Sequence, residues 1–230
     1  MSYGRMPFGW IINGGLRQFS AAEATIGREI TALKSYLTIA GFLDWKNRET
    51  VLSIFDIQGI TGASKPMVSR GLRLLEDRGL VIIHDRADLN TNVYELGAME
   101  NHYRKVPQDV IGLNLKQLGN RGAVSLAALK LYVAMLYHRN EKTGDAAVSH
   151  QTLVNETGVR PELVKNAYKV LHTCGFVTVS RSSALRELSA SGFATNAYKM
   201  HGDFTGLERA VRRPGAIRSR QRKGILPWAD

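Results

Sequence analysis

The chain has few of the residues that mark secreted and membrane proteins. It contains a single cysteine, Cys174, so no internal disulfide can form, as is usual for proteins of a reducing compartment. No apolar run approaches the ~18 residues of a membrane span, and the N-terminus lacks the basic, apolar and small-residue regions of a signal peptide. These absences predict a cytoplasmic protein with no membrane partner.

Sequence motifs of common enzymes are also missing. The sequence has no Cys-x-x-Cys pair, no Gly-rich loop ending in Gly-Lys and no Gly-x-Ser-x-Gly elbow, and its six histidines are scattered. His172 and Cys174 are the nearest approach to a metal-ligand pair, but their place at the end of an expected helix favours a structural role. We therefore expect no catalytic residue, no metal, no cofactor and no enzymatic activity.

Positive charge is in excess and is unevenly distributed. The formal net charge is +11 and the pI is about 9.9. Lys and Arg balance Asp and Glu over residues 28–110, whereas residues 111–204 and residues 205–230 each carry +5. A basic surface attracts polyanions because neutralised phosphates release their condensed counterions. The second half and the end of the chain are thus the candidate nucleic-acid-binding parts.

The sequence repeats itself without gaps at an offset of 96 residues. Leu126, Leu129, Lys130, Tyr132, Ser149, Leu153, Thr157, Gly158, Val164, Leu171, Gly175 and Val177 correspond to Ile30, Leu33, Lys34, Tyr36, Ser53, Ile57, Thr61, Gly62, Val68, Leu75, Gly79 and Val81. An upstream echo relates residues 3–7 to residues 103–107. The chain therefore contains one structural unit twice.

Each copy has the pattern of three helices followed by two strands. Apolar spacings of three and four predict a first helix, for which Ser125 is a candidate N-cap in the second copy. Ser53 and Ser149 are expected to cap a short second helix that ends at Gly62 and Gly158. A third helix starts near Pro66 or Pro161 and closes at Gly79 or Gly175, and the strands follow at 80–83 and 92–96, and at 176–179 and 196–200.

This order predicts a mainly α fold with small β wings, in the α+β class. The predicted architecture is two tandem winged helix-turn-helix domains that arise from the internal repeat. Residues 1–97 form the first unit with its N-terminal extension, residues 98–204 form the second unit with its linker, and residues 205–230 are a basic C-terminal tail.

Residues 64–81 resemble the recognition helix and first wing strand of MarR-like transcription regulators. The tandem layout of the whole chain is similar instead to plasmid replication initiators of the Rep type. The latter resemblance implies that one unit serves largely for dimerisation and the other mainly reads repeated DNA sites. The first unit has almost no net charge and the second unit is basic, which agrees with this division of roles. A homodimer through the first unit is therefore one option.

The third helix of each unit is the candidate reader of the DNA major groove. In the second unit Leu163, Val164, Ala167, Tyr168 and Leu171 form the inward stripe, and in the first unit Val68, Leu72 and Leu75 do so. The outward residues are predicted to bind double-stranded DNA; they are Lys65, Ser69, Arg70, Arg73, Arg160, Lys165, Asn166 and Lys169. The alternative is that these are solvated helix faces with no ligand.

The loop between the last two strands and the C-terminal tail add further basic residues. We expect these to contact phosphates too: Arg181, Arg186, Arg212, Arg213, Arg218, Arg220, Arg222 and Lys223, with Arg209 beside them. The alternative for the tail is a solubilising role. The final residues 225–228, Ile-Leu-Pro-Trp, are apolar and are expected to pack back on the protein or on a partner.

Three functions are compatible with these patterns. The first is a sequence-specific double-stranded DNA-binding protein that regulates transcription in the cytoplasm, associated with the nucleoid. The second is a plasmid or phage replication initiator that binds repeated origin sites. The third is a winged-helix scaffold that binds proteins, for which neutral or acidic recognition helices would be expected, unlike the third helix of the second unit.

Overall fold

A computed structural model describes residues 3–44, 46–86, 90–97, 103–180 and 196–205. The first half consists of β1 (Tyr3–Pro7), α1 (Gly9–Ile12), the 3-10 helix η1 (Gly15–Gln18), α2 (Ile26–Gly41), β2 (Glu49–Leu52), α3 (Ile54–Thr61), α4 (Lys65–Asp77), β3 (Val81–Arg86) and β4 (Thr91–Leu96). The second half consists of β5 (Tyr103–Pro107), α5 (Gln108–Asn114), the 3-10 helix η2 (Leu115–Gln117), α6 (Ala123–His138), β6 (Asp145–Val148), α7 (His150–Thr157), α8 (Pro161–Thr173), β7 (Val177–Ser180) and β8 (Asn196–Met200). The two halves have the same order of elements, and the fold is a mixed α+β structure.

Each half closes with the same small antiparallel sheet. The strand orders are β2-β4-β3 in the first half and β6-β8-β7 in the second. The predicted strand pairs β3/β4 and β7/β8 are confirmed. Strands β2 and β6, which come before the second helix of each half and pair with β4 and β8, were not predicted.

The predicted short helices α3 and α7 begin and end where the sequence indicates. Ser53 caps α3, since its Oγ accepts from the Asp56 N–H at 3.0 Å while the Asp56 carboxylate accepts from the Ser53 N–H at 2.9 Å. This reciprocal pair satisfies two helix-terminal donors. Gly62 (φ 67°) and Gly158 (φ 64°) adopt the left-handed conformation that ends each helix.

The expectation that Ser125 caps α6 is wrong. The helix begins at Ala123, and Gly122 occupies the N-cap position with φ 84°. The N–H of Ser125 already donates to the Gly122 carbonyl at 3.2 Å, so Ser125 lies inside the first turn. A glycine that can take positive φ starts the helix before the serine is reached.

The two echoing segments of the sequence pair with each other. Strands β1 and β5 form an antiparallel two-stranded sheet in which Tyr3 faces Pro107, Arg5 faces Lys105 and Pro7 faces Tyr103. Because the pairing exchanges equivalent positions of the repeat, it relates the two halves by an approximate two-fold axis through the Arg5–Lys105 pair. The relation is the one that two identical subunits of a symmetric dimer would have.

The segment that precedes the central helix of each half packs against the other half. The Arg17 Nε in η1 donates to the Asn155 carbonyl of α7 at 2.7 Å. In the other direction the Asn120 Nδ2, just after η2, donates to the Gly62 carbonyl after α3 at 2.7 Å. Helix η1 thus packs on α7 and η2 packs on α3. We call residues 3–19 and 103–120 the arms.

Two buried lysines at equivalent positions of the repeat secure this crosswise packing. Lys34 of α2 donates from Nζ to the Thr61 carbonyl at 2.9 Å, to the Asn120 Oδ1 at 2.7 Å and to the Leu118 carbonyl. Lys130 of α6 donates from Nζ to the Phe19 carbonyl at 3.0 Å. Each central helix therefore holds the arm of the other half through a charged hydrogen bond.

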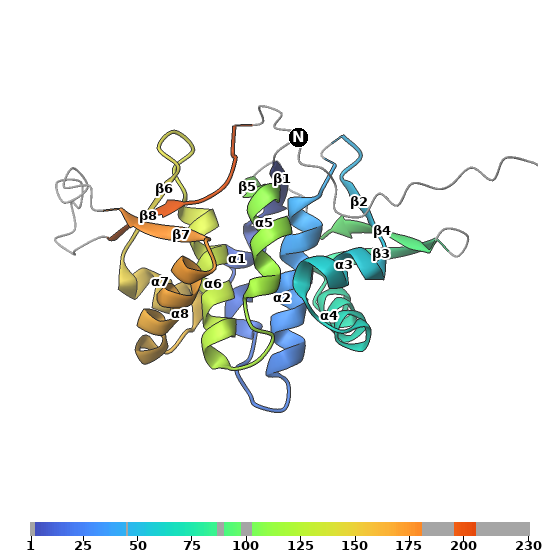
Figure 1. The fold of residues 1–230 in the computed structure, drawn as a ribbon, viewed down its shortest axis with the longest axis horizontal. Coiled ribbons are helices and arrows are strands. Elements are labelled where there is room, and N and C mark those ends of the chain that lie inside the picture. The colour runs from blue at the N-terminus through green and yellow to red at the C-terminus, as the bar shows by residue number, and fades with distance from the viewer. Residues whose placement is uncertain (1–2, 45, 87–89, 98–102, 181–195, 206–230) are drawn as a thin grey trace, which may run out of the picture.

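The hydrophobic core is continuous across the two halves. Helices α2 and α6 pack against each other at the centre, with α3 and α4 on one side and α7 and α8 on the other (Figure 1). Leu33 and Tyr36 of α2 and Leu129 and Tyr132 of α6 are fully buried in one cluster. None of the helices in the described ranges is long and apolar enough to cross a membrane.

The Lys34 contact predicts an unusual pH dependence of stability. Burial lowers the pKa of Lys34 to about 8, below the ordinary value of 10.5. Between these two pKa values the unfolded chain holds a proton that the folded chain has released, so this group adds stability as the pH rises.

We expect Lys34→Met to destabilise the protein by about 2 kcal/mol or more at pH 7, because two buried carbonyls and a partly buried amide oxygen lose their donor. The deficit of the variant relative to the wild type should widen by about 1–2 kcal/mol between pH 7.5 and pH 9.5. Urea unfolding at both pH values measures it. Exposed Lys46→Met is the control, and a deficit that stays constant with pH would contradict the assignment.

Candidate nucleic-acid interface

Helix α8 has a buried face and a free polar face. Pro161 lies in its first turn, where a missing N–H costs nothing. Val164, Ala167 and Leu171 are fully buried in the core, as predicted. Leu163 and Tyr168 of the predicted inward stripe are partly buried. The predicted outward residues Lys165, Asn166 and Lys169 are exposed, as are Glu162 and His172.

The polar side chains of α8 are available to a ligand. Within the described ranges, the side chains of Lys165, Asn166 and Lys169 take part in no hydrogen bond or ion pair. Arg160, the N-cap residue, lies 3.4 Å from Glu162 between its Nε and the carboxylate, and both side chains are more than 60% exposed. Such a solvated pair contributes little and does not hold the arginine in place.

Helix α4 follows the same plan with a different charge. Val68, Leu72 and Leu75 are buried, while Lys65, Arg70 and Arg73 are exposed and Ser69 is half-buried. Glu76 and Asp77 are also exposed, at its C-terminal end. The outward face of α4 is therefore mixed in sign, whereas that of α8 carries Glu162 alone against its basic residues.

The two candidate recognition helices lie at the end of the molecule that is opposite the β1–β5 sheet. At that end α4 lies to the right of the central α2 and α6 pair and α8 to its left (Figure 1). The predicted residues of the β7–β8 loop and the tail lie outside the described residues; they are Arg181, Arg186, Arg212, Arg213, Arg218, Arg220, Arg222 and Lys223.

One basic residue near α4 was missed by the sequence analysis. Arg28, in the first turn of α2, lines a surface pocket of about 350 Å³ together with Arg70 and Met67 of α4. The equivalent position in the second half is Val124, so comparison of the two copies gave no signal. The first half thus adds Arg28 to the basic residues beside its candidate recognition helix.

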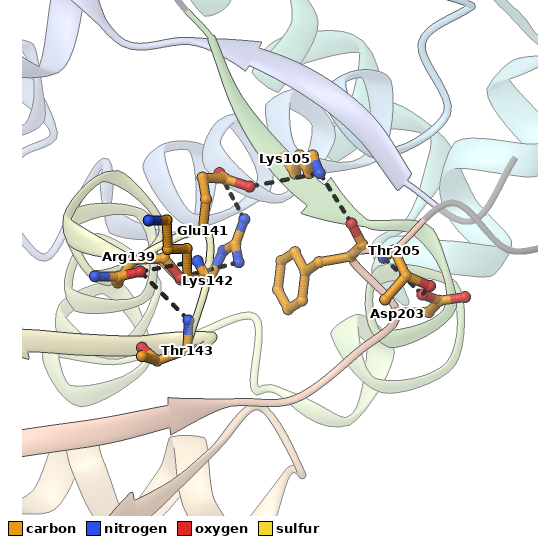
Figure 2. Close-up of polar contacts among 9 residues, drawn as sticks. Lys105, Arg139, Glu141, Lys142, Thr143, Asp203 and Thr205 are labelled. Atoms are coloured by element: carbon orange, nitrogen blue, oxygen red, sulfur yellow. Dashed lines mark hydrogen bonds and ion pairs between the residues drawn. The ribbon is translucent and has the colours of Figure 1, made fainter.

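A polar cluster on the opposite side fastens the end of the second half to β5 (Figure 2). Glu141 lies 2.7 Å from the Arg139 guanidinium and 3.5 Å from the Lys105 Nζ. Lys105 also donates to the Phe204 carbonyl at 3.1 Å, and the Arg139 guanidinium lies 3.9 Å from the centre of the Phe204 ring. Although the buried Arg139 Nε has no hydrogen-bond partner among the described residues, the charged groups pair with one another, so we assign the cluster a structural role.

Metal-ligating side chains are not gathered in the described part of the chain, where no three His, Cys, Asp or Glu residues could hold a metal ion. Cys174 is buried at the C-cap of α8. Burial raises the pKa of its thiol, an effect that the nearby Lys34 charge partly opposes. A buried thiol with a raised pKa is a poor nucleophile.

Comparison with known proteins gives no relative for this chain. No family model, no curated protein and no solved structure matches it. The chemistry of its own surface is therefore the basis for assigning a function.

Asn166 tests whether the α8 face reads bases. An amide can form two hydrogen bonds with adenine, which contributes about 1–3 kcal/mol of discrimination without counterion release. We expect Asn166→Ala to reduce the preference for a selected DNA site over random duplex by about 5-fold or more. Competition binding measures this preference.

Asn47→Ala, an exposed change in the turn before β2, is the matched control. An equal drop in the affinity of the Asn166 variant for selected and random duplexes would exclude base reading by this residue.

Proposed function

We propose that the chain is a sequence-specific double-stranded DNA-binding protein that regulates transcription, built from two tandem winged helix-turn-helix units. The observation that carries the proposal is the outward face of α8. It presents two lysines and an asparagine, free of partners among the described residues, directly opposite the buried stripe. We place its site of action in the cytoplasm, at the nucleoid.

The local structure around α8 supports insertion into a major groove. Helix α7, the turn at Gly158 and α8 form a helix-turn-helix, and β7 and β8 follow as a hairpin beside it. A helix fits the major groove, where lysine pairs with guanine and asparagine with adenine. The α3–α4 pair repeats this arrangement in the first unit, with Arg70 and Arg73 outward.

The fixed relation between the units supports recognition by one chain. The β1–β5 pairing and the crossed arms relate α4 to α8 by an approximate two-fold axis. Dimeric helix-turn-helix proteins use such an axis to read two inverted half-sites on one duplex. The proposal therefore extends to a site with two inverted, non-identical half-sites, read by a single chain.

Replication initiation is the second candidate, and the tandem order of two like units supports it. An initiator would bind several direct repeats of one site, whereas a regulator would bind isolated inverted half-sites. Selection of DNA from a random pool with the purified full chain separates these two functions.

We expect the second unit to supply most of the affinity. Lys165→Ala with Lys169→Ala should weaken binding to the selected site by about tenfold or more, since each lysine that binds a phosphate or a base contributes on the order of 1 kcal/mol. The slope of log affinity against log salt should fall by about 0.9 for each phosphate that the variant no longer neutralises. Arg70→Ala with Arg73→Ala should have a much smaller effect.

Fluorescence anisotropy titrations at several salt concentrations measure both quantities, with Lys46→Ala with Lys142→Ala as a control that removes two exposed lysines elsewhere. Equal reductions in the two helix variants would show that both units bind DNA alike. An unchanged affinity in both would contradict the proposed function.

A further inference from the structure

The outward face of the β2-β4-β3 sheet is apolar at its centre. Val51 of β2 pairs with Val93 of β4, and Ile82 of β3 lies beside Glu95 on the same face. Val51 is 51% exposed and Ile82 is 48% exposed. Phe55, at the start of α3 just beyond β2, is 77% exposed. His84 of β3 lies beside Val93 on the same face.

The second unit shows that the fold does not require apolar side chains on this face. In the β6-β8-β7 sheet, Ala147 and Ala197 stand where the first unit has Val51 and Val93. Thr178 stands in place of Ile82, and Gln151 in place of Phe55. The same backbone is therefore built with small or polar residues on this face. Contiguous exposed apolar residues that the fold does not need mark an interaction surface.

We propose that the apolar C-terminal segment of the same chain, residues 225–228, docks on this outer face of the first sheet. Its Ile, Leu and Trp side chains supply the apolar area that the face leaves uncovered. The inference goes beyond the proposed DNA-binding function and does not depend on it.

The charges around the two sheets favour the first. Glu49 and Glu95 pair across the strands on this face, the Glu95 carboxylate lies 2.8 Å from the His84 Nε2, and Asp85 is exposed near the end of β3. Residues 209–223, which lead to the docking segment, contain seven basic residues. The corresponding face of the second sheet carries Asp145 in place of Glu49 and Lys199 in place of Glu95, and these two residues pair across the strands. The first face is therefore acidic and the second is balanced, so attraction of the basic tail favours the first sheet.

The attachment point allows the segment to reach this face. Phe204 is held on β5 by Lys105 and by the Arg139 guanidinium (Figure 2). Strand β5 lies between the two three-stranded sheets (Figure 1). The 19 residues from 206 to 224 span up to about 60 Å when extended, against a radius of gyration of about 17 Å for a chain of this size. The linker is therefore long enough for residues 225–228 to reach either sheet, and the charges and apolar residues of the two faces decide between them.

Cysteine cross-linking tests the docking in the full chain. In a Cys174→Ser background, Val51→Cys with Ala229→Cys should form a disulfide within one chain under mild oxidation, and it leaves residues 225–228 intact. The matched control is Ala147→Cys with Ala229→Cys, which places the same thiol at the equivalent position of the second sheet. We expect at least about fivefold faster intramolecular cross-linking in the Val51 variant, because docking raises the effective concentration of the thiols.

Non-reducing electrophoresis with mass spectrometry of the linked peptides measures the rate, and circular dichroism checks that each variant folds. Equal rates in the two variants would overturn the proposal. Cross-links between chains through the thiol introduced at position 51, in place of links within one chain, would also overturn it and would identify a second copy as the occupant of the face. DNA binding is not part of this readout, so failure here leaves the proposed function standing.

Discussion

The arrangement of the two units depends on the crossed arms and on the buried lysines that hold them. Lys34 and Lys130 occupy the same position of the repeat, and each donates to a carbonyl in the arm of the other half. A buried ammonium is expensive to desolvate, and hydrogen bonds offset that cost, from three acceptors at Lys34 and from the Phe19 carbonyl at Lys130. The lysines thereby link the two halves at the centre, while the β1–β5 sheet links them at one edge.

This linkage bears directly on the proposed function. Under the proposed function, each unit would read only a few base pairs, and two units held in a fixed relation would gain affinity from a second groove without a second chain. The two copies have diverged on their outer faces while their cores stay alike. Position 70 is arginine in α4 and its equivalent in α8 is Asn166, and position 51 is valine where the second sheet has Ala147.

Much of the fold could be predicted from the sequence because local signals and the repeat agreed. The serine caps, the left-handed glycines and the spacing of buried residues fixed α3, α4, α7, α8 and the hairpins. Strands β2 and β6 were missed because four residues are too few to show a periodicity. The β1–β5 pairing and the crossed arms could not be predicted, because a sequence repeat shows that two segments are alike but not that they touch. Arg28 became a neighbour of Arg70 only through the packing of α2 on α4.

Hydroxyl-radical footprinting of a selected duplex, combined with the stoichiometry of the complex, shows whether the linked units read DNA as one body. We predict two protected patches whose centres lie about one helical turn, ~10 base pairs, apart, produced by one chain per duplex. As the protein concentration is lowered, the folded double variant Lys34→Met with Lys130→Met should lose DNA protection by the first unit before it loses protection by the second unit. A single patch in the wild-type complex, or two patches that appear only when two chains bind, would contradict recognition by a single chain.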